Sequence, residues 1–284
     1  MTDHRAETQS AQIQIYRAAD GYRCAARVWK TPNPVGRVVF LHGIISHGGW
    51  YLRSCQALAA AGFEVHFLDR RGSGLNADAR GDVVDCQTWI DDARGYIWSL
   101  PSDAPKLLMG ISWGGKLAVA TLKRSPELVA GMALICPGLY AQYGSNRFQR
   151  RALAIAARLG LEKRKAPIPL RNPALFTDSA AWQRFVGEDP LTLRTVTIRA
   201  ALADIKLTQE ARQNPELVTT PTLLMLSSRD RIIDNARVRE LFSRFSSSDK
   251  RLREYPAAHT LEFEDDPGPY LQDLCGWAKD VVGA

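Results

Sequence analysis

The sequence contains few cysteines, and they follow neither a disulfide pattern nor a metal-binding pattern. Five of the 284 residues are cysteine, an odd number, and no two of them have the C-x-x-C spacing. We therefore expect no disulfide framework, no metal site and no cofactor. The scattered positions favour reduced, mostly buried thiols in a cytoplasmic protein. The cysteines are Cys24, Cys55, Cys86, Cys136 and Cys275.

Long apolar runs and a signal region are also missing. No apolar run approaches the ~18 residues that cross a bilayer, and residues 1–7 lack the apolar segment of a signal peptide. The chain has 284 residues, 45% of them hydrophobic, which is enough for one large core with an insertion. The sequence therefore predicts a soluble protein of one main core.

The most informative motif is the pentad at residues 110–114, Gly-Ile-Ser-Trp-Gly, which has the form G-x-S-x-G. It follows an apolar run at residues 106–109 that predicts a short buried strand, and it precedes a helical segment at 116–123. A serine on such a strand-to-helix turn is strained and exposes its hydroxyl, and the following N–H groups face developing negative charge. The pattern alone occurs by chance in many chains, so Ser112 needs partners elsewhere in the sequence.

A serine nucleophile needs a base, usually a histidine, and in this arrangement the chain order is serine, acid, histidine. Of the five histidines only His259 follows Ser112, so it is the predicted base. The acid should follow the strand predicted at residues 221–226, where Asp230 and Asp234 compete. Asp230 is nearer to the strand end and is assigned to the triad, whereas Asp234 is placed as the N-cap of the next helix.

A second oxyanion donor is expected in the loop that follows the apolar strand at residues 37–41. This strand runs into His42-Gly43, the usual place of that donor, so we predict the N–H groups of Ile44 and Trp113 as the oxyanion hole. A phosphate cradle is disfavoured because the loop lacks the glycine spacings of nucleotide-binding loops. His42 precedes the serine and is expected to make structural hydrogen bonds.

These residues together resemble the α/β-hydrolase superfamily, and within it the monoacylglycerol lipase and lysophospholipase-like branch. Residues 40–51 are similar to its H-G-x-x-x-H-x-x-R-Y signature, with Trp50 in place of arginine, and residues 68–74 are similar to its D-x-x-G-x-G turn. The resemblance covers roughly residues 36–138 and 218–282. It departs from the commoner G-H-S-M-G nucleophile motif of the branch.

The resemblance implies a serine hydrolase that cleaves a carboxylic ester of a hydrophobic or amphiphilic small molecule through an acyl-enzyme on Ser112. Two alternatives remain open: an amide- or peptide-cleaving serine hydrolase, and a non-catalytic protein that binds a small molecule on the same scaffold. The complete set of triad residues argues against the second alternative. Hydrolases with an aspartate nucleophile are disfavoured because that position is a serine.

Strand and helix patterns alternate along the chain, which predicts a mostly parallel, twisted sheet with helices on both faces, the α/β-hydrolase fold. An antiparallel hairpin opens the chain. We divide the chain into a first core part (1–138), a helical cap (139–217) and a second core part (218–284). The predicted strands are 13–17, 23–30, 37–41, 63–69, 106–109, 131–136, 221–226 and 250–255, and the core helices are 51–61, 88–99, 116–123, 236–245 and 269–281.

The predicted cap begins with a strongly basic segment at residues 147–171, which holds eight basic residues and one acidic residue, Glu162. At helical spacing, one face carries Phe148, Ala152, Ile155, Ala156 and Leu159, and another carries Arg147, Arg150, Arg151 and Arg158. Either the apolar face packs on the pocket with a solvated basic back, or the segment contacts anionic lipid or an acidic substrate. Nucleic acid is not an expected partner, because no binding module is present.

The substrate pocket is expected to be mainly apolar. A bulky tryptophan next to the nucleophile should narrow the acyl site and favour short to medium acyl chains. The residues predicted to line it are Gly43, Ile44, Trp113, Leu139, Phe176 and Ile233.

Overall fold

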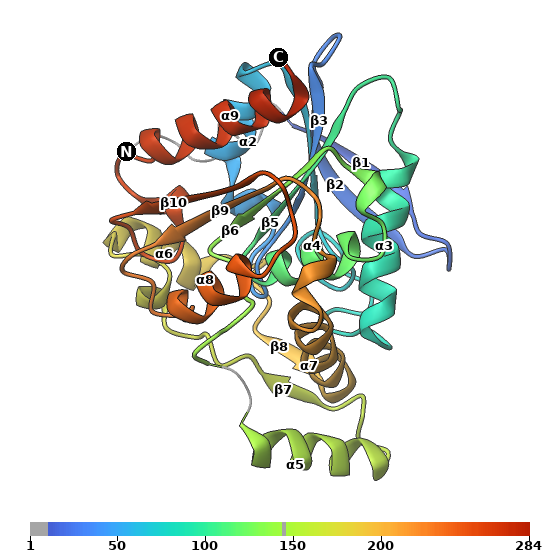
Figure 1. Ribbon diagram of the computed structural model, residues 1–284. Helices are drawn as coiled ribbons and strands as arrows, with labels where there is room; N and C mark the ends of the chain where they lie inside the picture. Colours follow the sequence, from blue (N-terminus) through green and yellow to red (C-terminus); the bar gives the residue numbers. More distant parts are fainter. Residues whose placement is uncertain (1–10, 144–145) are drawn as a thin grey trace.

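The computed structural model describes residues 11–143 and 146–284 and is built around an eight-stranded sheet (Figure 1). Residues 1–7, where no signal region is expected, lie outside this range. The strand order is β1-β2-β4-β3-β5-β6-β9-β10. The strands are β1 (Gln12–Arg17), β2 (Arg23–Trp29), β3 (Gly36–Leu41), β4 (Phe63–Leu68), β5 (Lys106–Ile111), β6 (Gly131–Ile135), β9 (Thr222–Ser227) and β10 (Lys250–Tyr255).

The sheet is parallel from β4 to β10, and at the other edge the single reversed strand β2 pairs antiparallel with both β1 and β4. Strands β3, β4, β6 and β9 are buried along their whole length. Helices that cover both faces leave no wet side to such strands, which explains their nearly continuous apolar sequence. The predicted fold class is confirmed, and the core elements begin and end within a few residues of the predicted positions.

The core helices lie on the two sides of the sheet (Figure 1). Helix α2 lies beside α9, and α3 packs against α4. Asp85 caps α3, and Asp234 caps α8 by accepting from the Arg237 N–H at 3.1 Å, as predicted. The helices are α2 (Leu52–Ala60), α3 (Cys86–Ser99), α4 (Trp113–Leu122), α8 (Asn235–Ser243) and α9 (Gly268–Val282).

The segment between β6 and β9, residues 139–217, is called the inserted segment below. It contains α5 (Arg147–Arg158), β7 (Lys165–Pro167), α6 (Ala180–Glu188), β8 (Thr195–Thr197) and α7 (Ile198–Arg212). Strands β7 and β8 form a two-stranded antiparallel ribbon, which the sequence analysis did not predict. Figure 1 shows α7 and this ribbon side by side, with α5 below both and farthest from the sheet.

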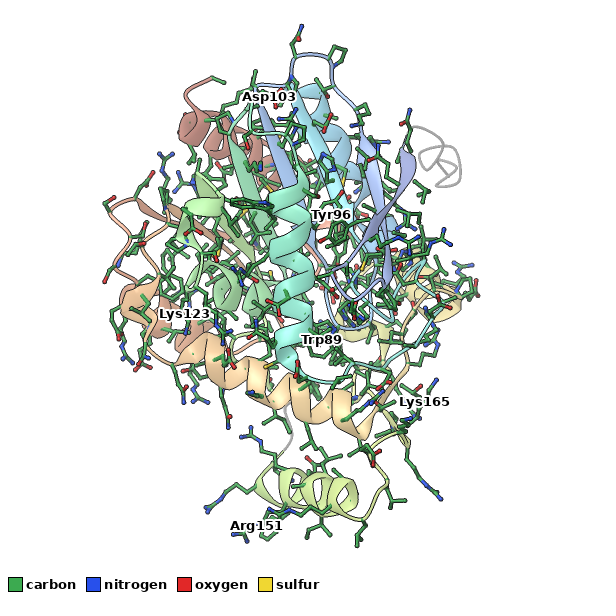
Figure 2. All side chains as sticks on the ribbon, turned by 90° about the vertical axis from the view of Figure 1, so that its right-hand side faces the viewer. Trp89, Tyr96, Asp103, Lys123, Arg151 and Lys165 are labelled. Carbon is green, nitrogen blue, oxygen red and sulfur yellow. The ribbon has the colours of Figure 1, made fainter. Side chains whose placement is uncertain are left out.

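Helix α5 leaves most of its large apolar side chains exposed, although Leu153 is partly buried. Phe148, Ile155 and Leu159 are 81%, 56% and 71% exposed, so the expectation that this face packs on the protein is wrong for its three largest members. Arg151 points away from the rest of the molecule (Figure 2). A capping box between Asn146 and Gln149 closes the start of the helix.

All five cysteines are unpaired; four are buried and Cys275 is partly exposed. Within the described ranges, no helix combines the length and the apolar character needed to cross a membrane.

Candidate active site

Ser112 lies on the sharp turn between β5 and α4, in a backbone conformation that non-glycine residues rarely adopt. Its φ is +50° and its ψ is −118°. Both glycines of the pentad are required by close approach: a Cβ on Gly114 would lie 2.0 Å from the Leu41 carbonyl oxygen, and one on Gly110 would lie 2.6 Å from the Cα of Gly115. The turn therefore strains the backbone at Ser112 and requires glycine two residues before it and two residues after it.

The three predicted triad residues meet at the carboxyl edge of the sheet. His259 Nε2 lies 3.0 Å from Ser112 Oγ, and His259 Nδ1 lies 2.8 Å from Asp230 Oδ2. The other oxygen of Asp230 accepts from the N–H groups of Ile232 and Ile233, at 2.8 and 3.0 Å.

The acid is held as a carboxylate. Burial by itself would raise the pKa of Asp230, but the charge and hydrogen bond of His259 and the two backbone N–H donors bring it below its ordinary value. A carboxylate at Nδ1 selects the tautomer with a proton on Nδ1, which leaves Nε2 free to accept from the Ser112 hydroxyl. The arrangement can therefore remove a proton from Ser112.

Two backbone amides beside Ser112 are available to a ligand. In the part of the chain that the structure describes, the N–H groups of Ile44 and Trp113 donate no hydrogen bond. A Cβ on Gly43 would lie 3.4 Å from Ser112 Cβ, so the 43–44 peptide lies next to the nucleophile.

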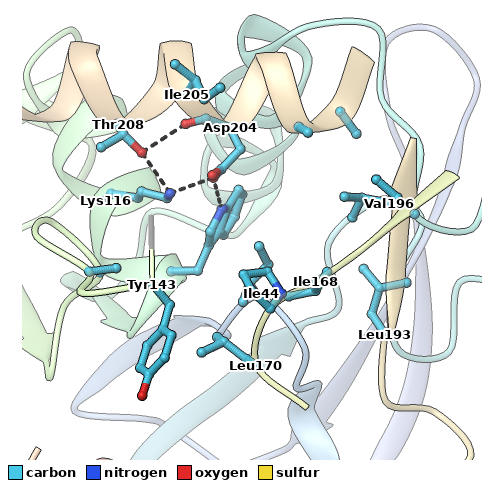
Figure 3. A pocket seen from close by; sticks show the side chains of 18 of the residues that line it. Ile44, Lys116, Tyr143, Ile168, Leu170, Leu193, Val196, Asp204, Ile205 and Thr208 are labelled. Carbon is cyan, nitrogen blue, oxygen red and sulfur yellow. Dashed lines mark hydrogen bonds and ion pairs between the residues drawn. The ribbon is translucent and has the colours of Figure 1, made fainter. Parts of the chain in front are cut away.

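A cavity of about 940 Å³ opens at Ser112. Figure 3 shows one apolar wall, formed by Ile44, Ile168, Leu170, Leu193 and Val196, while Ile205 lines the cavity apart from them, from α7. The rest of the lining is richer in charge than the sequence analysis expected. Its basic residues are Arg70, Arg71, Lys116, Arg150, Arg171 and Arg212, and its acidic residues are Asp82 and Asp204.

Of the residues predicted to bind substrate, Ile44, Trp113 and Ile233 line this cavity, whereas Gly43, Leu139 and Phe176 do not. Phe176 supports the histidine loop instead. Its ring meets the His259 ring edge-on at 5.9 Å, and its carbonyl accepts from the Thr260 N–H at 2.9 Å.

Leu139 is buried, and its carbonyl accepts from Arg212 Nε at 2.5 Å. Both Leu139 and Phe176 are apolar residues of the predicted cap, and the sequence alone does not distinguish them from residues that line the cavity.

A polar cluster under the cavity was missed by the sequence analysis. The Trp113 indole N–H and Lys116 Nζ both reach Asp204 Oδ1, each at 2.5 Å, and Lys116 also donates to Thr208 at 2.8 Å (Figure 3). Asp204 and Thr208 lie on α7, in the inserted segment. No sequence motif identifies Asp204 and Thr208, because only tertiary packing brings them to Trp113 and Lys116.

Cys136, Asp230 and His259 offer ligand atoms within 4.8 Å of one another, which is the spacing of a metal site. Two of these atoms, His259 Nδ1 and Asp230 Oδ2, are already joined by the hydrogen bond of the triad. The proximity is thus explained by the triad geometry, and the cluster supplies no separate donor set.

The family model described as "Serine aminopeptidase, S33" (Hydrolase_4) matches residues 32–266. The chain belongs to this family. Within the α/β-hydrolases it falls in the branch of the monoacylglycerol lipases, and it is a hydrolase of the lipase and esterase type. The resemblance found in the sequence is confirmed.

Relatives and solved structures agree with this placement. The chain is 30% identical to a monoacylglycerol lipase of Mycolicibacterium smegmatis, over 90% of this chain and 93% of that protein. It is 29% identical to the phospholipase YtpA of Bacillus subtilis, over 84% and 92%. A soluble variant of the monoglyceride lipase of Saccharomyces cerevisiae, solved with a substrate analogue, shares the fold with a TM-score of 0.83 at 20% identity, over 96% of each chain.

Proposed function

We propose that this α/β-hydrolase cleaves a carboxylic ester of a hydrophobic or amphiphilic substrate through an acyl-enzyme on Ser112. The observation that carries the proposal is the continuous hydrogen-bonded series from Asp230 through His259 to Ser112 at the floor of a cavity. Residues 139–217 act as the helical cap of this site, between the core parts 1–138 and 218–284.

Each group has a defined role in the reaction. His259 Nε2 takes the Ser112 proton as the oxygen attacks the ester carbonyl, and the N–H groups of Ile44 and Trp113 stabilise the oxyanion. His259 then returns the proton to the leaving alcohol. A water molecule, deprotonated by the same nitrogen, releases the acid and restores Ser112. Asp230 stabilises the imidazolium throughout and keeps its own charge.

The lining of the cavity supports an amphiphile with an acyl chain as substrate. The wall in Figure 3 offers apolar side chains to the chain, and each buried CH₂ contributes about 0.8 kcal/mol until the space is filled. kcat/KM should therefore rise and then fall along an acyl series, with an optimum at short to medium length. Trp113→Ala should move that optimum to longer chains.

The basic lining favours a substrate with an anionic head over a neutral monoacylglycerol. Relatives of this chain include proteins named monoacylglycerol lipase and phospholipase, so both classes belong in the test. Comparing a monoacylglycerol with the lysophosphatidic acid of the same acyl chain isolates the head group.

A second proposed contact is with anionic lipid surfaces through α5, which exposes Phe148, Ile155 and Leu159 beside its arginines. Sedimentation with phosphatidylcholine vesicles, with and without phosphatidylglycerol, tests this contact. Binding that needs the anionic lipid and is lost when Arg147 and Arg151 are both replaced by Ala supports it, and equal binding to both vesicles argues against it.

The proposed function is tested by labelling. A fluorophosphonate should add once per chain, at Ser112, and an ester panel should show turnover that the labelled protein lacks. An anilide with the same acyl group tests the amide-cleaving alternative. A folded protein that neither labels nor turns over any ester would favour the non-catalytic alternative.

A further inference from the structure

Arg70 is a buried arginine with an unusual set of partners. It is the second residue after β4, is 7% exposed, and forms no ion pair within the part of the chain that the structure describes. Its guanidinium donates instead to two backbone carbonyls, that of Gly43 at 2.8 Å and that of Ile44. Removing a guanidinium cation from water is energetically unfavourable when no carboxylate pairs with it, so we expect this residue to have a function other than packing.

The two carbonyls belong to the loop that supplies a proposed oxyanion donor. In a trans peptide the C=O and the following N–H point in opposite directions. Arg70 holds the Gly43 carbonyl on its own side, and therefore turns the Ile44 N–H to the opposite side of the peptide.

His42 completes the hold on this peptide. Its Nε2 accepts from the Arg70 backbone N–H at 3.0 Å, so the neutral ring carries its proton on Nδ1, which donates to the Gly43 carbonyl at 2.7 Å. Burial lowers the pKa of His42 to about 3, so the ring stays neutral at neutral pH. The structural role expected for His42 is thus confirmed, and the Gly43 carbonyl is fixed by two donors.

The same guanidinium reaches the second proposed donor. It stacks over the Trp113 indole at 4.5 Å from the ring centroid. Two further contacts hold the Trp113 ring. Trp89 packs against it edge-on, with the ring centroids 4.9 Å apart, and Asp204 accepts a hydrogen bond from its N–H. Arg70 therefore contacts both segments whose N–H groups would bind the oxyanion.

We propose that Arg70 is a positioning residue of the oxyanion hole: it ties the 43–44 peptide to Trp113, so that both N–H groups aim at one point before substrate arrives. The inference rests on the proposed function of Ser112. An oxyanion exists in the transition state and not in the bound ester, so a loosened hole lowers kcat and leaves KM nearly unchanged.

The test uses three variants of the full chain and a p-nitrophenyl ester. Arg70→Ala should lower kcat by roughly 10²-fold, the range for loss of one oxyanion donor, with KM within about threefold. Arg70→Lys keeps the charge but cannot serve two carbonyls, so it should recover only part of kcat. The matched control is Arg80→Ala, because Arg80 also donates to two carbonyls, those of Gly74 and Leu191, but to neither carbonyl of the 43–44 segment.

A second readout separates positioning from general loss of structure. A trifluoromethyl ketone forms a tetrahedral adduct with the serine, whereas the corresponding methyl ketone binds without one. In Arg70→Ala, affinity for the first should fall by the same factor as kcat/KM, and affinity for the second should stay constant. Millimolar guanidinium should restore part of kcat in Arg70→Ala and have no such effect on Arg80→Ala.

Several outcomes overturn the inference: an Arg70→Ala enzyme with unchanged kcat, a rise in KM at constant kcat, full activity in Arg70→Lys, or equal losses in Arg80→Ala. If Arg70→Ala does not fold, Arg70→Lys and the ketone pair decide alone. Full activity in Ser112→Ala would instead contradict the proposed function, and this separates the two failures.

Discussion

The carboxyl edge of the sheet and helix α5 of the inserted segment differ in how far their functional side chains are buried. At the sheet edge, Ser112 is 9% exposed, and the side chains of His259 and Asp230 are buried with each of their nitrogens and oxygens in a hydrogen bond. On α5, large apolar side chains such as Phe148 and Ile155 are exposed. The side chains of one region are held by hydrogen bonds, and those of the other are exposed, with no element among the described residues covering them.

The contrast separates two requirements of the proposed reaction. Bond cleavage needs groups held within fractions of an ångström by rigid elements, which parallel strands provide at their ends. Contact with a chemically variable amphiphile needs exposed apolar and cationic surface, which a rigid core would bury. The four predictions below test whether the two regions differ as sharply in energy as they do in exposure.

The largest effect is expected at the sheet edge. Ser112→Ala and His259→Ala should each lower kcat by roughly 10⁴- to 10⁶-fold, because each removes a member of a triad that acts as a unit. Ester hydrolysis under steady-state conditions measures the effect, and circular dichroism checks the fold. A folded Ser112→Ala protein that keeps most of its activity would contradict the mechanism.

A smaller loss should distinguish two aspartates four residues apart. Asp230→Asn leaves His259 without the carboxylate that selects its tautomer, and kcat should fall by roughly 10⁴-fold. Asp234→Asn keeps a good N-cap on α8 and should leave kcat within about twofold. The reverse ranking would move the acid to Asp234.

Local patterns were enough to predict the sheet edge. The pentad around Ser112, the single downstream histidine and the strand ending before Asp230 are each visible within a few residues of sequence. Parallel strands then bring these segments to one edge, whatever the loops between them do. This is why the structure places His259 and Asp230 within hydrogen-bonding distance of their expected partners.

The inserted segment could not be predicted in the same detail. Asp204 contacts Trp113 and Lys116 across 91 and 88 positions of sequence, and no local pattern encodes such a pairing. Helical periodicity indicated the apolar stripe of α5 but not whether anything covers it. Arg70 lies within the D-x-x-G-x-G turn found in the sequence, yet its carbonyl partners are defined only by the folded loop.

Glu262, three residues after His259, should make the stability of the core depend on pH. Its carboxylate accepts from the N–H groups of Arg53 and Ser54 and from the Ser54 hydroxyl at the start of α2. Burial nevertheless raises its pKa to about 7. A carboxyl with a raised pKa in the folded state contributes stability that is present below about pH 4.5 and lost as the pH rises through about 7.

Urea unfolding between pH 4.5 and 8 measures this contribution. The free energy of unfolding should fall with rising pH by on the order of 3 kcal/mol more in the native chain than in Glu262→Gln. Glu240→Gln, at an exposed position on α8, is the matched control and should follow the native chain. Parallel curves for all three proteins would show that Glu262 does not couple pH to folding.

The smallest effect is expected on α5, where it tests the exposed half of the comparison. Ile155→Ala and Leu159→Ala should each change the free energy of unfolding by less than about 0.5 kcal/mol, because neither side chain is buried and alanine favours the helix. Leu207→Ala on α7 is the internal reference. Its side chain is fully buried, and its truncation should cost about 2–5 kcal/mol. A loss above about 2 kcal/mol in Ile155→Ala would mean that α5 packs against the protein in solution, and the surface assigned here to lipid would not be free to bind it.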